Sequence, residues 1–382
     1  MMMTLNTKAP DNPVRYLHNI EIREKEPHMQ ASMQDVRDWQ NSSLISLNTY
    51  YKYIYIYTYI FFSSSLTKSS SLHSIQSLLY FLFIFLNMKT TSILLALAST
   101  LTGADAWWKG FNSQATLANG ACKTQADWEN DFRLIQSFPN GFNSLRVYAS
   151  SDCNTINTVV PAAIATGGKV LVGVWTEDAA HYEAEKQALL AATRTYGFDW
   201  LVAVSVGSED LYRGDTTASV LAQQIYDVRG MLSTVPGYST DKVLVGHVDT
   251  WTMWTDGRNV DVIKACDFIG LDGYPYFQNG EENDIGVASD LFWQSVNAVR
   301  GAVQNAGSYS WVWVTETGWP TTGATENKAV ASVANAQTYW KEVGCSALNQ
   351  VHIFWYSLQD FSAVPSFGVA DANGKALYDL SC

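Results

Sequence analysis

The sequence predicts a (β/α)8 barrel, an α/β fold with eight parallel strands, built as a single domain over residues 107–382. Two observations indicate this fold. Eight short apolar runs bounded by turn residues recur along the segment, and most are continuously apolar, as in strands buried on both faces. Helical segments separate them, and a strand followed by a helix, repeated eight times in about 250 residues, is typical of the closed barrel.

Each expected strand is one of these apolar runs, of which KVLVGVWT at Lys169–Thr176 is representative. In chain order the expected strands are Trp107–Ser113, Asn143–Ala149, Lys169–Thr176, Trp200–Glu209, Lys242–Thr250, Asp267–Pro275, Ser310–Gly318 and Gln350–Leu358.

The segments between the strands carry helical signals. Thr124–Phe138 places large apolar side chains three or four residues apart, on one face of a helix. Asp178–Tyr196 and Thr216–Met231 behave similarly, and each opens with a capping residue. A doubly wound open sheet is the alternative fold, but it usually has fewer strands and a glycine-rich phosphate loop. Neither GxGxxG nor GxxxxGK[ST] occurs in the sequence.

The first 106 residues differ in character from the rest. Residues 1–87 include the biased runs YKYIYIYTYIFF and LLYFLFIFL. Residues 88–106 combine a basic start, a short apolar segment and a small-x-small ending, the pattern of a secretory signal peptide. We expect residues 1–87 to be an extension foreign to the native protein, with cleavage after Ala106. A membrane span is the alternative, but the polar break NMKTTS interrupts the apolar runs.

Charge and composition narrow the partners. The chain has a net charge of −12, and an acidic surface repels phosphate backbones, so we expect no nucleic acid partner. Its 14 Trp, 20 Tyr and 16 Phe fit a large core, but also a groove whose rings match the flat faces of sugars. Residues 107–382 contain no apolar stretch long enough to cross a membrane, and we expect a secreted monomer.

All five cysteines lie in residues 107–382, where secretion makes disulfides plausible. Cys122 and Cys153 follow the first two expected strands and can close one loop layer, while Cys345 and Cys382 can hold the tail against the barrel. Cys266 is then left as a buried thiol. No Cys or His spacing resembles a metal site, and we expect neither a metal nor a cofactor.

Two glutamates follow apolar strands at the end where barrel enzymes carry their active sites. Glu209 ends the fourth expected strand and Glu316 ends the seventh. A single glutamate at a strand end is explained by a helix cap or an ion pair. Two glutamates that face the same end of the barrel indicate a function, because burying two carboxylates costs free energy. Glycosidic bond cleavage uses such a pair, with carboxyl groups ~5–5.5 Å apart for retention and ~6.5–9.5 Å apart for inversion.

The segments around both glutamates resemble the signatures of glycoside hydrolase family 17, the β-1,3-glucanases of plants and fungi. The matching segments are VSVGSEDLYR (Val204–Arg213), VWVTETGWPTTG (Val312–Gly323), LRVYASSDC (Leu145–Cys153) and GLDGYPYFQ (Gly270–Gln278). The resemblance covers nearly all of residues 107–382 and is fungal in detail.

The resemblance implies that Glu209 is the general acid/base and Glu316 the nucleophile of a retaining reaction. Tyr148 matches a site tyrosine of the family, and Ser208 takes the place of a family site residue. Their places at strand ends or beside the glutamates make further residues candidates for substrate contact: Trp175, Asp249, Trp251, Tyr274, Tyr276, Trp319 and Trp355. For most of these the plain alternative is packing; Tyr274 is expected to steady the nucleophile. Ser208 stands where the family usually has an asparagine that bonds the sugar 2-hydroxyl, which puts that contact in doubt.

The leading functional hypothesis is endo-hydrolysis of β-1,3-glucan in fungal cell-wall remodelling or glucan degradation. Glucanosyl transfer through the same two glutamates is the first alternative, and exo-acting glucose release is another. A hypothesis of a different class is a non-catalytic protein that binds wall glucan, against which the presence of both glutamates counts.

Overall fold

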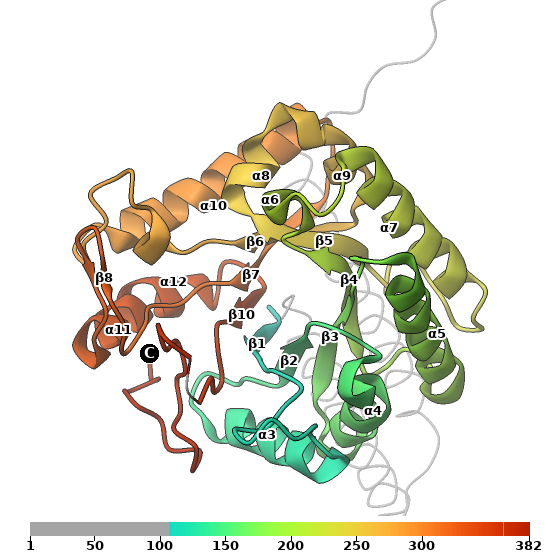
Figure 1. Cartoon of the computed structure of the whole chain (residues 1–382), viewed down its shortest axis with the longest axis horizontal. Helices are drawn as coiled ribbons and strands as arrows, with labels where there is room; N and C mark the ends of the chain where they lie inside the picture. The colour runs from blue at the N-terminus through green and yellow to red at the C-terminus, as the bar shows by residue number, and fades with distance from the viewer. Residues whose placement is uncertain (1–106, 362) are drawn as a thin grey trace, which may run out of the picture. The chain divides into compact units, whose positions relative to one another are not determined.

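The computed structural model describes residues 107–361 and 363–382, which form a closed barrel of eight parallel strands (Figure 1). The strands are β1 (Lys109–Asn112), β2 (Ser144–Val147), β3 (Lys169–Val174), β4 (Leu201–Ser208), β5 (Val245–Thr250), β6 (Phe268–Asp272), β7 (Trp311–Glu316) and β10 (Ile353–Trp355). Their order around the barrel follows the chain, and β1 pairs with both β2 and β10 to close the ring. The (β/α)8 prediction is confirmed, whereas the expected extension 1–87 and signal peptide 88–106 lie outside the described residues.

Helices surround the strands, as Figure 1 shows. The longer ones are α3 (Gln125–Ser137), α4 (Thr155–Thr166), α5 (Ala179–Tyr196), α7 (Ala218–Ser233), α10 (Ala288–Asn305) and α11 (Val333–Tyr339). Short helices are α6 (Asp210–Arg213), α8 (Trp251–Thr255), α9 (Val260–Ala265) and α12 (Cys345–Ala347), with a π-helical turn at Trp340–Gly344 and 3-10 turns at Asp152–Asn154, Gly257–Asn259 and Pro275–Phe277. A small antiparallel pair, β8 (Thr325–Glu326) and β9 (Ala329–Val330), lies outside the barrel. None of the described helices is long and apolar enough to cross a membrane.

Side-chain caps fix where the helices begin. Thr124 and Asp127 form a reciprocal capping box at the start of α3, and Asp178 accepts two backbone N–H groups at the start of α5. The helix expected from Thr216 begins at Ala218, because the hydroxyl of Thr217 accepts the N–H of Val220 and so makes Thr217 the cap.

The barrel has two apolar layers, one drawn from the strands alone and one between the strands and the helices. A small inner cluster is drawn from the strands alone: Leu171, Val202, Ala203, Phe268, Trp313 and Phe354. A larger layer packs the strands against the helices. Because successive side chains of a strand alternate between the two faces, the residue two places beyond an inner one also points inward, nearer the top.

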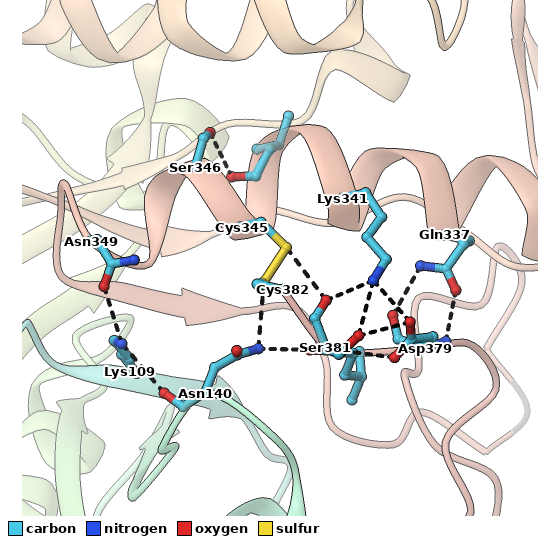
Figure 2. The surroundings of a disulfide bond; sticks show 12 residues. Lys109, Asn140, Gln337, Lys341, Cys345, Ser346, Asn349, Asp379, Ser381 and Cys382 are labelled. Carbon is cyan, nitrogen blue, oxygen red and sulfur yellow. Dashed lines mark hydrogen bonds and ion pairs between the residues drawn. A yellow bond between two sulfur atoms is a disulfide. The ribbon is translucent and has the colours of Figure 1, made fainter.

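Two disulfides join the pairs expected from the sequence, Cys122 with Cys153 and Cys345 with Cys382, and Cys266 is buried and free. Figure 2 shows how the second one holds the C-terminal tail. Beside it, the ammonium group of Lys341 contacts the Asp379 carboxylate at 2.8 Å and the Ser381 carbonyl at 2.9 Å. The tail is therefore attached to the barrel by both a covalent bond and a polar network.

Candidate active site

Glu316 ends β7, is 8% exposed, and receives three hydrogen-bond donors. The phenol of Tyr274 donates to Oε2 at 2.7 Å, the phenol of Tyr148 donates to Oε1 at 3.0 Å, and Nη1 of Arg146 contacts Oε1 as an ion pair. Burial, and then the charge of Glu316, raise the pKa of both tyrosines well above the usual value, so both stay donors. Donors and a cation stabilise the ionised form of a carboxyl group, so the arrangement favours Glu316 as a carboxylate.

Arg146 is the residue whose role the sequence reasoning missed. It is 1% exposed inside β2, where every residue is buried. Its guanidinium donates to Asn112 Oδ1 at 2.8 Å and to Ser208 Oγ at 3.0 Å as well as to Glu316. Burial is the largest single influence and opposes its charge, but Glu316, Tyr148 and Asp272 together outweigh burial and raise the pKa of Arg146. An arginine inside a strand buried on both faces was the available signal, because such a charge requires a partner.

Glu209 directly follows β4 in a left-handed conformation, with φ 56°. Such a φ is uncommon for a residue with a side chain, and it occurs mostly where the surroundings enforce it. The turn requires glycine at position 207. Its φ is 74°, and a Cβ there would lie 2.1 Å from an oxygen of Asp210. The N–H of Glu209 donates to the Val248 carbonyl at 2.8 Å, which ties the turn to β5.

The carboxyl group of Glu209 has a pKa raised from 4.5 to about 7. Partial burial is the largest cause, followed by the negative charges of Glu316 and Asp249. Arg213 opposes the shift from 3.9 Å away. Glu209 therefore holds its proton up to near-neutral pH.

Asp249 lies in a different environment from the one expected from the sequence. We expected it to contact substrate, but it is 0% exposed and its oxygens bind groups of the protein. Oδ2 accepts the N–H of Leu211 at 3.0 Å and contacts Nε2 of the buried His247, also at 3.0 Å. Burial is the largest influence and lowers the pKa of His247, but the hydrogen bond to Asp249, the charges of Asp249 and Asp210 and the bond to the Val206 carbonyl together raise it. Asp249 therefore holds the backbone that follows Glu209, and His247 holds the end of β4 that precedes it.

Three aromatic residues expected to contact sugar are also buried. Tyr276, Trp319 and Trp355 are 0%, 1% and 2% exposed, so in this structure they are core residues. The indole of Trp319 donates to the Val330 carbonyl at 3.0 Å, and the ring of Trp355 packs 4.8 Å from that of Trp340. These residues were expected to contact sugar because they are large aromatic residues in or near strand ends. Neither property indicates whether a side chain points into the site or into the core.

Tyr356, which the sequence reasoning did not select, shares the inward phase of Phe354 in the strand-only cluster. It is partly exposed, and its ring lies 5.8 Å from that of Tyr274. Burial, followed by the charge of Glu316, raises the pKa of its phenol to about 12. One step along the strand thus separates the buried Trp355 from a tyrosine that faces the site.

The remaining expected residues lie around the glutamates. Ser208 is 7% exposed and accepts from Arg146, as described. Trp175 is partly exposed, with the guanidinium of Arg213 5.2 Å from its ring centroid, and Trp251 is partly exposed at the start of α8. Phe277, which is not one of the expected site residues, is 48% exposed beside Tyr274.

One group of metal-ligating type occurs in the described part of the chain, formed by Asp152, His181 and Glu185. Glu185 is fully buried and already accepts the backbone N–H groups of Ser150, Ser151 and Trp175. These bonds occupy both of its oxygens, so the cluster ties together the loops after β2 and β3.

Comparison with known proteins gives one family and several relatives. Residues 110–369 match the BtgE/BtgC glycoside hydrolase domain. A probable glucan endo-1,3-beta-glucosidase of Aspergillus oryzae is 40% identical over 313 residues, which cover 76% of this chain and 66% of the relative. A glucan 1,3-beta-glucosidase of Schizosaccharomyces pombe is 36% identical over 277 residues, covering 69% of this chain and 84% of the relative. The chain thus spans just under two thirds of the Aspergillus oryzae relative.

A solved structure of similar fold is a glycoside hydrolase family 17 beta-1,3-glucanosyltransferase from Rhizomucor miehei. It is 25% identical with a TM-score of 0.59, and the match covers 70% of this chain and 95% of that one. An active-site mutant of the Rhizomucor miehei enzyme was solved in complex with laminaritriose.

Proposed function

This chain belongs to the BtgE/BtgC glycoside hydrolase family, and on that premise we propose that it hydrolyses internal bonds of β-1,3-glucan with retention of configuration. The observation that carries the proposal is the contrast between the surroundings of two carboxyl groups at the ends of β4 and β7. Glu209 has a pKa of about 7, and Glu316 is held by an arginine and two phenols. One acid and one carboxylate are what glycoside cleavage requires.

In the first step, an oxygen of Glu316 attacks the anomeric carbon while Glu209 gives its proton to the departing glycosidic oxygen. The bond to that oxygen breaks and a glycosyl ester forms on Glu316. In the second step, Glu209, now a carboxylate, takes a proton from water as the water oxygen attacks the anomeric carbon; the bond from that carbon to Glu316 breaks, which restores both groups. Arg213, 3.9 Å from Glu209, stabilises the carboxylate that exists between the steps.

The tyrosines and Arg146 hold Glu316 in one orientation before the attack, so little reorganisation is left for the reaction itself. Tyr356, Trp175 and Trp251 are the partly exposed rings that we propose stack on sugar units. Ser208 is too short for the contact that the family's asparagine makes, and its hydroxyl is bonded to Arg146. We propose that a sugar 2-hydroxyl reaches this place through Arg146 or through water.

Glucanosyl transfer is the second candidate, and the likeness to the Rhizomucor miehei transferase favours it. It differs in the second step only, where a sugar hydroxyl replaces water. Nothing in the arrangement of the two glutamates separates the two outcomes.

The test is the time course of products from a linear β-1,3-glucan and from short oligosaccharides of the same linkage. Endo-hydrolysis gives mixed oligosaccharides early, which shorten with time, and Glu316→Ala abolishes them. Products longer than the starting oligosaccharide indicate the transferase, while glucose alone from the first minutes indicates exo action. A folded protein that binds glucan without any turnover contradicts the enzymatic proposal and supports the wall-binding hypothesis.

We also propose that the protein acts outside the cell as a monomer. The two disulfides support an oxidising compartment, since such bonds are rare in cytosolic proteins. Mass measurement of the protein in culture medium tests both points, because it reports the mature start, the disulfides and the oligomeric state.

A further inference from the structure

A third carboxyl group lies beside the nucleophile. Asp272 ends β6, stands opposite Glu316 in the register of β6 with β7, and is 2% exposed. It was not among the residues expected from the sequence, and the two-step reaction above makes no use of it. A buried titratable group so close to the reacting carboxylate requires an account of its charge.

The hydrogen bonds of Asp272 are too few for a buried carboxylate. Its Oδ1 accepts from the hydroxyl of Thr315 at 2.9 Å, and its Oδ2 is buried with no partner in the described part of the chain. Glu316, one strand away, takes two phenols and the guanidinium. A carboxylate out of water needs several donors or a cation, whereas a neutral carboxyl group tolerates one neutral bond far better.

Among the described residues, the cation that contacts Glu316 is Arg146, and none of its hydrogen bonds goes to Asp272. The hydrogen bonds of Arg146 go to Asn112, Ser208 and Glu316. The charged and titratable groups that act on Asp272 and Glu316 from the surrounding strands are Arg146 on β2, Tyr148 after β2, Glu209 after β4, Tyr274 after β6 and Tyr356 after β10. One guanidinium therefore lies near two carboxyl groups but bonds only Glu316, and two anions here would compete for it.

We propose that Asp272 is held as a neutral carboxylic acid, which keeps Arg146 bound to Glu316 and leaves the nucleophile as the one anion of the pair. Asp272 is thus a positioning residue that acts through Arg146. Burial, followed by the charge of Glu316, raises the pKa of Asp272 well above its usual value, in agreement with the geometry. The proposal deepens the proposed function and rests on Glu316 being the ionised partner.

Infrared spectroscopy tests the charge of Asp272 without any assay of activity. In the Glu209→Gln protein the acid/base can no longer contribute a protonated carboxyl band. We expect such a band to persist at pH 7 and to disappear when Asp272→Asn is added. A spectrum of the Glu209→Gln protein without that band overturns the proposal, whether or not the double variant folds.

Kinetics give the matching test in the otherwise unchanged protein. Asparagine is neutral and similar in shape to aspartic acid, so Asp272→Asn is expected to keep kcat/KM within about tenfold and to leave both limbs of its pH profile in place. Asp272→Glu is the control, because its longer side chain moves the carboxyl group toward Arg146 and lowers kcat more than it changes KM. A shifted pH profile for Asp272→Asn means that an ionised Asp272 was removed, which contradicts the proposal. If the protein has no glucanase activity, only the proposed function fails, since the infrared result does not depend on turnover.

Discussion

Replacing Glu209 by glutamine is expected to stabilise the protein at alkaline pH while it abolishes hydrolysis. The pKa of Glu209 is raised from 4.5 to about 7, chiefly by burial, so the folded state binds this proton more tightly than the unfolded state. The stability from this group is therefore full below pH 4.5 and is lost as the pH rises through the folded pKa of about 7. Glutamine has no proton to lose, and the loss disappears with it.

The size of the effect follows from the shift. At about 1.36 kcal/mol per pKa unit, the full shift corresponds to roughly 3 kcal/mol. The Glu209 side chain is 30% exposed, so solvent screening reduces the figure, and roughly 2 kcal/mol is expected at pH 8. For a domain of this size that amounts to roughly 4–8 °C in Tm, if each kcal/mol is worth about 2–4 °C.

The assay is denaturant unfolding of the wild type and Glu209→Gln at pH 4, 6 and 8. The difference in free energy of unfolding should be near zero at pH 4 and should grow in favour of the variant toward pH 8. Glu342→Gln removes the same charge from an exposed position and should show no such trend. A difference between wild type and Glu209→Gln that stays flat with pH would refute the raised pKa and, with it, the acid role at neutral pH.

Three further expectations concern the site and the tail. Tyr274→Phe removes a donor to Glu316 worth roughly 1.5–3 kcal/mol, so kcat/KM should fall roughly 10–100-fold with little change in Tm; an unaltered kcat/KM contradicts the positioning role. Activity should decline as the pH rises through about 7, because Glu209 loses its proton. Asp249→Asn should move this decline to lower pH, because the charge of Asp249 helps to raise the pKa of Glu209. A decline at the same pH in the variant excludes Asp249 as a cause of the raised pKa. Cys382→Ser opens a loop of 37 residues and should lower the free energy of unfolding by roughly 2–4 kcal/mol in denaturant titrations, with kcat unchanged; equal stability would show that the polar network alone holds the tail.

The barrel could be predicted because its strands carry a strong local signal. The run KVLVGVWT is apolar without alternation from Val170 to Trp175, as expected of a strand covered on both faces, and β3 lies within the run at Lys169–Val174. The two glutamates were visible for a related reason, since a charge that directly follows such a run is costly without a function. The ends of helices were harder to predict. The helix expected from Thr216 begins at Ala218, with Thr217 as its cap.

The rest of the site depends on which face of a strand a side chain occupies. Near the end of a strand buried on both sides, inner and outer positions carry similar large side chains, so no sequence pattern favoured Tyr356 over Trp355. Burial presents the same difficulty, because Asp249 lies near the end of β5, where a substrate contact is expected, but it is fully buried and bonded to the backbone that follows Glu209. The roles of Arg146 and Asp272 depend on contacts between side chains of β2, β6 and β7. The sequence alone does not reveal these contacts, because the partners are up to 170 positions apart.

The most direct test of the account is to trap the intermediate on the nucleophile. The protein is incubated with a β-1,3-linked disaccharide fluoride carrying fluorine at the 2-position of the reacting sugar, which slows both steps while the fluoride leaves without acid assistance. Peptide mass spectrometry should then find the sugar attached to Glu316, with no adduct in Glu316→Ala. An adduct on Glu209, or turnover of β-1,3-glucan with inverted products and no adduct at all, would contradict the assignment of the two carboxyl groups.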